Sequence, residues 1–121
     1  MDLQTDHFLD FYDNAPLGFL ACDREGRIEN LNRTAAGMLG LSRPGAEGVA
    51  LAALIHPREV SGFWAFLHQV GDAGPDWVTG EFRLRGSDRP MTVQVHGMSA
   101  PGSDGGAQVR LAITDVTERK E

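Results

Sequence analysis

The chain has one cysteine, one lysine and no long hydrophobic run among its 121 residues. The single thiol, Cys22, can form no internal disulfide and cannot build a cysteine-rich zinc site. No apolar stretch approaches the roughly 20 residues that a membrane-spanning helix needs. The opening residues, 1–6, lack the basic and then apolar order of a signal peptide. These absences predict a cytoplasmic protein without a membrane segment.

Positive charge is also scarce, because 11 Lys and Arg residues stand against 17 Asp and Glu residues and leave a net charge of −6. A surface that binds nucleic acid needs clustered Lys and Arg. The sequence has no such cluster, so we expect no nucleic-acid partner. The apolar fraction of 41% and the charged fraction of 23% are ordinary for a folded domain. The length suits one domain with its own core.

Residues 1–14 are expected to form an amphipathic flanking helix. Phe11 and Tyr12 come three and four residues after Phe8, so the three side chains share one helix face. A helix this short is marginal in water and needs a surface to lie on. The three aromatic residues are therefore the candidate seam of a homodimer. The alternative is that they pack only on the chain's own sheet.

Helical signals dominate the middle of the chain. Asn32 is a strong N-cap, and Gly40 is the expected end of the helix that it starts. Residues 42–45 are interpreted as a break, and the run 49–55 is too short to assign. Pro57 suits the first position of the longest helix. The apolar stripe of that helix consists of Val60, Phe63, Leu67 and Val70.

The remaining segments alternate apolar and polar residues and are expected to be strands. They are residues 17–22, 27–31, 77–84, 91–96 and 109–114. Helices grouped between two strands and three strands predict an α+β fold with one antiparallel sheet. The middle helices would cover one face of this sheet, and the flanking helix would cover part of the other.

Four short motifs occur along these elements in a fixed order. They are Asn14-Ala15-Pro16-Leu17-Gly18, then Ile28-Glu29-Asn30-Leu31-Asn32 with Ala35-Ala36 and Leu39-Gly40, then His56-Pro57-Arg58-Glu59, and finally Ile113-Thr114-Asp115-Val116-Thr117-Glu118-Arg119-Lys120. This series resembles the PAS family of sensor domains. The resemblance extends over residues 11–120, nearly the whole chain.

The resemblance implies a five-stranded antiparallel sheet of order 2-1-5-4-3, with helices over one face that enclose a pocket. It implies a PAS domain over residues 15–116 and the start of a linker at 117–121, leading to an output domain that follows. Asp115, Thr117 and Arg119 would relay the signal to that domain. Members of the family hold haem, flavin, a chromophore or a metabolite in the pocket, or hold nothing and dimerise.

The residues disfavour two of these cofactors. Haem needs an axial ligand aimed into the pocket, and His68 lies off the apolar stripe of its helix. The cysteine motif of the light-sensing flavin relatives is absent, and Cys22 is interpreted as a small buried hydrophobe. A non-covalent small ligand stays open. No carboxylate is spaced with a His or Ser as in a catalytic triad, so we expect no catalytic site and no metal site.

A ligand would contact apolar residues from the helices and the sheet. The candidate pocket residues are Leu31, Met38, Leu54, Phe63, Leu67, Phe82, Val93, Val95 and Ile113. The alternative is that these side chains fill an ordinary core. The sequence thus predicts a non-enzymatic sensor module, with a histidine kinase as the first expected parent protein. The alternatives are the input domain of a diguanylate cyclase or phosphodiesterase, and a ligand-free interaction module.

Overall fold

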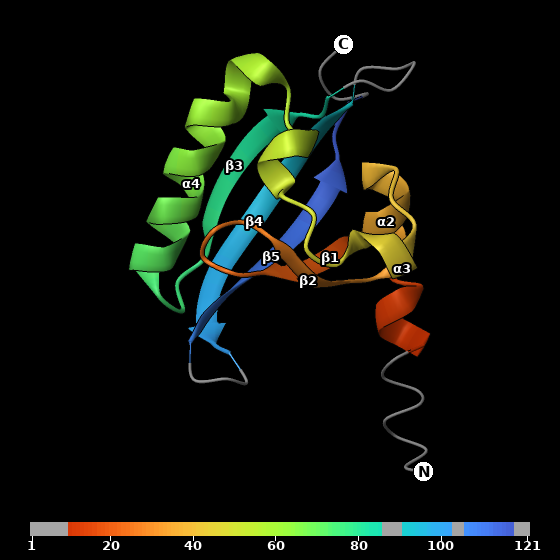
Figure 1. The fold of residues 1–121 in the computed structure, drawn as a ribbon, viewed down its shortest axis with the longest axis horizontal. Coiled ribbons are helices and arrows are strands. Elements are labelled where there is room, and N and C mark those ends of the chain that lie inside the picture. Colours follow the sequence, from red (N-terminus) through yellow and green to blue (C-terminus); the bar gives the residue numbers. More distant parts are fainter. Residues whose placement is uncertain (1–9, 86–90, 103–105, 118–121) are drawn as a thin grey trace.

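A five-stranded antiparallel sheet forms the centre of the computed structural model, which describes residues 10–85, 91–102 and 106–117 (Figure 1). Its order is β2-β1-β5-β4-β3, as the resemblance implied. The strands are β1 (Gly18–Cys22), β2 (Ile28–Leu31), β3 (Val78–Arg83), β4 (Thr92–Pro101) and β5 (Ala107–Asp115). The predicted α+β class and strand order are confirmed.

Strand β5 lies in the middle of the sheet, although it comes last in the chain. Ile113 pairs with Gly18 of β1 on one side and with Val95 of β4 on the other. The inward positions of β5 carry Val109 and Leu111 as well, and both are buried. The final strand is therefore hydrogen-bonded along both edges, and its inner face is buried because the helices pack on that side of the sheet.

The helices lie together on one face of the sheet (Figure 1). They are α2 (Arg33–Leu39), α3 (Arg43–Ala46), the 3₁₀ turns η1 (Leu51–Leu54) and η2 (Pro57–Glu59), and α4 (Val60–Ala73). Gly40 ends α2 with φ of 70°, a left-handed conformation that glycine adopts without strain. The predicted break at 42–45 is wrong, because Pro44 sits in the first turn of α3, where its missing N–H costs nothing.

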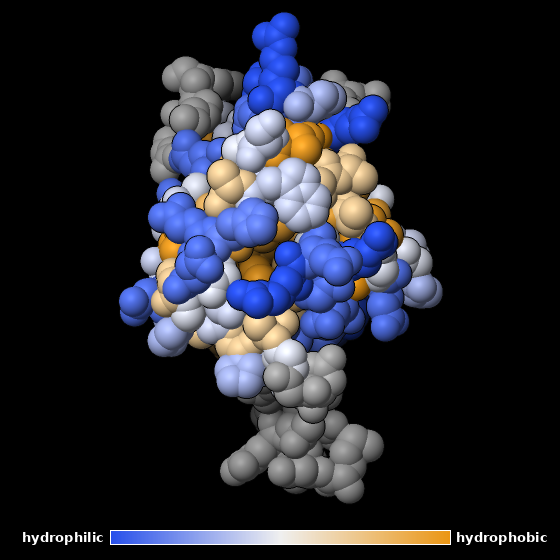
Figure 2. Space-filling model, turned by 60° about the vertical axis from the view of Figure 1, so that its left-hand side comes forward, coloured by the Kyte–Doolittle hydropathy of each residue, from blue (hydrophilic) through white to orange (hydrophobic). Residues whose placement is uncertain are grey.

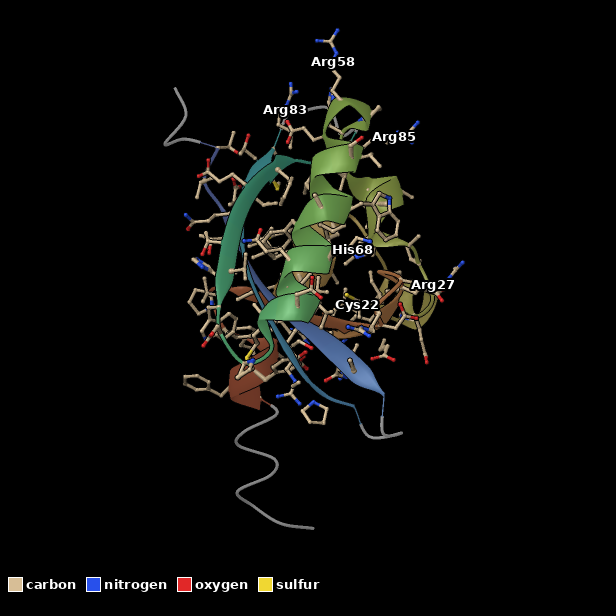
Figure 3. All side chains as sticks on the ribbon, turned by 90° about the vertical axis from the view of Figure 1, so that its left-hand side faces the viewer. Cys22, Arg27, Arg58, His68, Arg83 and Arg85 are labelled. Carbon is tan, nitrogen blue, oxygen red and sulfur yellow. The ribbon has the colours of Figure 1, made fainter. Side chains whose placement is uncertain are left out.

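Helix α4 buries the stripe that its sequence predicted. Phe63, Leu67 and Val70 are buried against the sheet, and Phe66 joins them. Val60, at the first turn, is only partly buried. His68 is exposed, so the expectation that it faces away from the stripe is confirmed (Figure 3).

Both outer strands of the sheet bond to other parts of the chain. Ile28 of β2 donates its N–H to the Val49 carbonyl and accepts from the Gly48 N–H. At the other border, the Arg83 carbonyl accepts from the His56 N–H, and the Arg83 N–H donates to a carboxylate oxygen of Glu59. These bonds satisfy edge groups that would otherwise face solvent.

Candidate functional site

The interior between helices and sheet is nearly full. Its cavity measures ≈20 Å³, about enough for one water molecule. Of the nine predicted pocket residues, those that line this cavity are Leu54, Phe63, Val93, Val95 and Ile113. The other four pack elsewhere in or against the same core; they are Leu31, Met38, Leu67 and Phe82. The structure thus brings the predicted residues together, with little space between them.

Three phenylalanines and two glycines account for the closed interior. The ring centroids of Phe63 and Phe66 lie 5.3 and 5.4 Å from that of Phe82, in edge-on arrangements. A Cβ at Gly80 would lie 3.0 Å from Phe66, and a Cβ at Gly97 would lie 2.9 Å from both Val70 and Leu111. Because both positions lack a side chain, α4 lies directly on β3 and β4, and the cavity that the described residues leave beneath it is too small for a metabolite.

A much larger hollow lies on the opposite, outer face of the sheet. We call it the outer groove; it measures ≈650 Å³, within the size range of small-molecule sites. Its lining residues are Phe11, Tyr12, Phe19, Leu20, Ala21, Asn30, Trp77, Met98, Gln108, Arg110, Leu111 and Ala112. None of them belongs to the predicted pocket, whereas Phe11 and Tyr12 belong to the predicted dimer seam. Phe8, the third seam residue, lies outside the described residues.

Strand pairing assembles the outer groove from residues far apart in the chain. Ala21 of β1 is opposite Arg110 of β5, which in turn is opposite Met98 of β4. In the next row Phe19 is opposite Ala112. The alternation of apolar and polar residues in the sequence identifies these positions as outward-facing. Small and apolar residues at such positions do not by themselves predict a binding surface. The strand pattern therefore does not indicate the groove.

Aromatic side chains form one wall of the outer groove. Tyr12, in the helical turn 10–13, stacks on Phe19 with the ring centroids 5.9 Å apart. Phe11 is 78% exposed and Trp77 is 59% exposed, the two large hydrophobic residues that the described chain leaves most open. The side of the molecule on which α4 lies is different, because polar residues dominate it and apolar residues show only in small patches (Figure 2).

Arg110 is the one charged residue among the described residues that line the outer groove. Its Nε donates to Gln108 Oε1 at 3.0 Å, and Gln108 Nε2 donates to Glu29 Oε1 at 3.2 Å. No carboxylate in the described part of the chain forms an ion pair with Arg110. The groove therefore combines an apolar lining with one positive group and the amides of Gln108 and Asn30.

Asn32 connects the helical turn to the sheet and to α2. Its Oδ1 accepts from the N–H groups of Phe19 and Ala35, each at 2.9 Å. Its Nδ2 donates to the carbonyls of Tyr12 at 2.7 Å and Leu17 at 3.0 Å. The side chain is fully buried, and four bonds satisfy it. The predicted N-cap is confirmed, and the same residue holds the backbone that carries Tyr12.

A charged contact also fixes the helical turn 10–13. Arg43 of α3 lies 3.0 Å from Asp13 Oδ2, while Asp13 Oδ1 is buried with no hydrogen-bond partner in the described structure. Burial and the Asp13 carboxylate raise the pKa of Tyr12 above its ordinary value, although the nearby Arg43 lowers it. Tyr12 therefore stays neutral at physiological pH beside the groove.

The end of β5 forms a small polar clasp with β4. Thr117 donates to Asp115 Oδ1 from its hydroxyl at 2.6 Å and from its N–H at 2.9 Å. The Thr92 N–H donates to the Thr117 hydroxyl, and the Val116 N–H donates to the Thr92 carbonyl. The hydrogen bonds from Thr117 lower the pKa of Asp115. Two predicted relay residues thus meet here, and Arg119 lies outside the described residues.

Reactive groups elsewhere are isolated from one another. Burial, with the charges of Asp23 and Glu29, raises the pKa of the Cys22 thiol to about 12, so it stays protonated. His56 accepts the Arg58 N–H at Nδ1 and caps η2. Within residues 10–85, 91–102 and 106–117, no three His, Cys, Asp or Glu side chains gather as a metal site would need. No helix in the same ranges is long and apolar enough to cross a membrane.

A family model described as "PAS fold" matches residues 12–121 of the chain. Among curated proteins, none is detectably similar in sequence. Solved structures show how far the similarity of fold extends.

A PAS domain of a protein from Colwellia psychrerythraea has a TM-score of 0.80 at 19% identity, with 98% of this chain and 100% of that chain covered. The PAS domain of an HTR-like protein from Haloarcula marismortui has a TM-score of 0.79 at 16% identity, covering 95% and 99%. A domain of a sensory box sensor histidine kinase/response regulator from Geobacter sulfurreducens has a TM-score of 0.71 at 19% identity, covering 93% and 94%.

Proposed function

Because the chain belongs to the PAS fold family, we propose that it is a non-catalytic regulatory module that self-associates through the outer groove and signals to an output domain. One observation supports this choice above others: the interior cavity of ≈20 Å³ is far too small for a metabolite, whereas the outer groove of ≈650 Å³ is open and apolar. The small interior cavity therefore favours the alternative that the sequence left open, a ligand-free interaction module, over a sensor that holds its ligand in the interior.

A second copy of the chain is the occupant that the outer groove suits. A two-fold symmetric interface uses the same patch on both partners, so that patch must offer a projection and a recess together. Phe11 is 78% exposed and supplies the projection. Ala21 and Ala112 form the floor of the groove and supply the recess. Phe11 of each copy would enter the groove of the other, and the aromatic rings of Tyr12 and Trp77 would be covered.

The signal would leave the domain along β5. Arg110 and Ala112 of β5 line the outer groove, and Asp115 of the same strand ends in the clasp with Thr117. Association or release of the second copy at the groove would change how often the contact between Asp115 and Thr117 is formed. That change would alter the direction in which the following segment leaves the domain. The proposed division of the chain is a flanking helix at 1–14, the PAS domain at 15–116 and the start of a linker at 117–121.

A histidine kinase is the proposed parent protein. The similarity to a domain of a sensor histidine kinase/response regulator supports this choice, and a diguanylate cyclase or phosphodiesterase is the alternative. In such a protein the module would lie on the cytoplasmic side. Neither haem nor covalent flavin is part of the proposal, because His68 is exposed and Cys22 is buried with a raised pKa. A visible absorption band in the purified protein would contradict it.

Sedimentation equilibrium of Phe11→Asp tests self-association. The wild type should sediment at twice the 13.1 kDa chain mass, and the variant should sediment as a monomer, because the short aspartate side chain cannot fill the partner's groove as the phenylalanine ring would. Gln69→Asp is the matched control, since Gln69 is exposed on α4 and should leave the dimer intact. A wild type that stays monomeric at high micromolar concentration, or a dimeric Phe11→Asp, would reject the proposed interface.

A further inference from the structure

The outer groove has one feature that a second copy does not explain. Its single charged lining residue, Arg110, is positive in a chain whose net charge is −6. No carboxylate of the described chain pairs with it. A two-fold interface would bring two such arginines, one from each copy, to the same apolar surface. The groove is therefore chemically matched to something that carries a negative charge.

We propose that the outer groove binds a small carboxylate with a flat apolar body, and that this ligand competes with the second copy for the same face. The competition rests on the proposed self-association, whereas the binding site does not. A sensor of this kind would detect its ligand on the outer face of the sheet instead of in the interior.

Charge and hydrogen-bond geometry favour a carboxylate. The guanidinium of Arg110 uses its Nε for Gln108 Oε1, so its terminal N–H groups stay available for a ligand. Charge-assisted bonds between guanidinium and carboxylate are among the stronger polar contacts in proteins. The amides of Gln108 and Asn30 lie along the same lining and supply further donors. Glu29 bonds to Gln108 and is not part of the lining, so it does not neutralise Arg110 directly.

The shape and lining favour a flat body of moderate size. Volumes of roughly 300–1,000 Å³ are typical of sites for small organic molecules, and the groove falls within this range. Trp77, Phe19 and Met98 present aromatic and thioether surfaces, which pack well against planar rings. Ala21 and Ala112 leave the floor flat. An aryl acetate satisfies both the cation and the apolar lining.

The test uses 1-naphthylacetate as the probe and 1-naphthylacetamide as its neutral control. Binding is measured by calorimetry and by quenching of tryptophan fluorescence, at a protein concentration where sedimentation shows monomers. The acid should bind the wild type about ten-fold more tightly than the amide, a difference typical of one charged hydrogen bond. Trp77→Phe should abolish most of the quenching while calorimetry still detects binding, because the remaining tryptophan, Trp64, is not in the groove.

Arg110→Gln and Arg58→Gln form the matched pair of variants. Each removes one positive charge from an exposed arginine, and Figure 3 shows Arg58 at the opposite end of the molecule from the helical turn 10–13. Arg110→Gln should weaken the acid about ten-fold and leave the amide unchanged, whereas Arg58→Gln should change neither by more than about two-fold. Equal affinities for acid and amide, equal losses in both variants, or no binding at millimolar probe would overturn the site.

Competition is measured separately, by sedimentation at rising probe concentration. At ten times its dissociation constant the acid should raise the apparent dimer dissociation constant about a hundred-fold, because both copies must release it to associate. If the acid binds through Arg110 but the dimer is unaffected, the competition is overturned and the dimer interface stands. If the acid binds and no dimer forms at any concentration, self-association fails while the ligand site stands.

Discussion

The inner face of the sheet leaves a cavity of ≈20 Å³ beneath the helices, whereas the outer face carries a groove of ≈650 Å³. Both faces come from the same strands, with residues alternating between them. The inner face has large side chains and tight contacts, such as the Phe63–Phe82 pair at 5.3 Å. The outer face has small floor residues and aromatic residues at its rim. In this fold, an open site and a filled core can lie one residue apart in the sequence.

The largest loss of stability is expected at Asn32, which links the two faces. Asn32→Ala would leave the Phe19 and Ala35 N–H groups and the Tyr12 and Leu17 carbonyls without their partner. Because some of these buried groups would stay unpaired, the free energy of unfolding should fall by about 4 kcal/mol. Urea denaturation measures the change. A loss below about 1 kcal/mol would show that the turn 10–13 is held in other ways.

Substitutions at the adjacent residues Gly97 and Met98 compare the packing of the two faces most directly. A side chain at Gly97 would meet Val70 and Leu111 at 2.9 Å, so Gly97→Val should cost about 2 kcal/mol of unfolding free energy. Met98→Val, one residue along on the groove side, should change it by less than about 0.5 kcal/mol. Urea denaturation of both variants gives the comparison. Equal costs would mean that the groove is packed as tightly as the core.

The smallest expected effect is the pH dependence of the clasp at the end of β5. Thr117 lowers the pKa of Asp115 in the folded state, so this contact stabilises the fold above the unfolded carboxyl pKa of about 3.9. The stabilisation is lost as the pH falls below that value toward the lowered folded pKa. Thr117→Val should therefore be less stable than wild type at pH 7, and the gap should narrow below about pH 4. A gap that stays constant would exclude the Asp115 carboxylate as its cause. Because Asp115 is exposed, solvent screening keeps the effect small.

Predictions from the sequence succeeded where a local signal was strong. Asn32 marked the start of α2 and Gly40 marked its end. The apolar stripe from Phe63 to Val70 marked the buried side of α4. The strand order came from the four motifs and not from the alternation, since alternation gives no pairing. α3 was missed because four residues around Pro44 look the same in a turn and in a single helical turn.

The site could not be predicted in the same way. A side chain such as Val95 has the same sequence pattern whether it lines a large pocket or fills a core, and the answer depends on how closely Gly80 and Gly97 let α4 approach. The outer groove joins Phe11 to Trp77 and Arg110, which only the strand pairing brings to one surface. The predicted seam residues Phe11 and Tyr12 were the sequence's one indication of that surface.

The hydrogen bonds along the two borders of the sheet limit how copies of this domain can assemble. Gly48 and Val49 bond to β2, and His56 and Glu59 bond to the end of β3. An incoming strand would have to displace these contacts before it could extend the ladder. Strand addition is thereby obstructed at β2 and at the Arg83 end of β3. Under the proposed self-association, the outer face would instead accept one partner copy and then be fully covered.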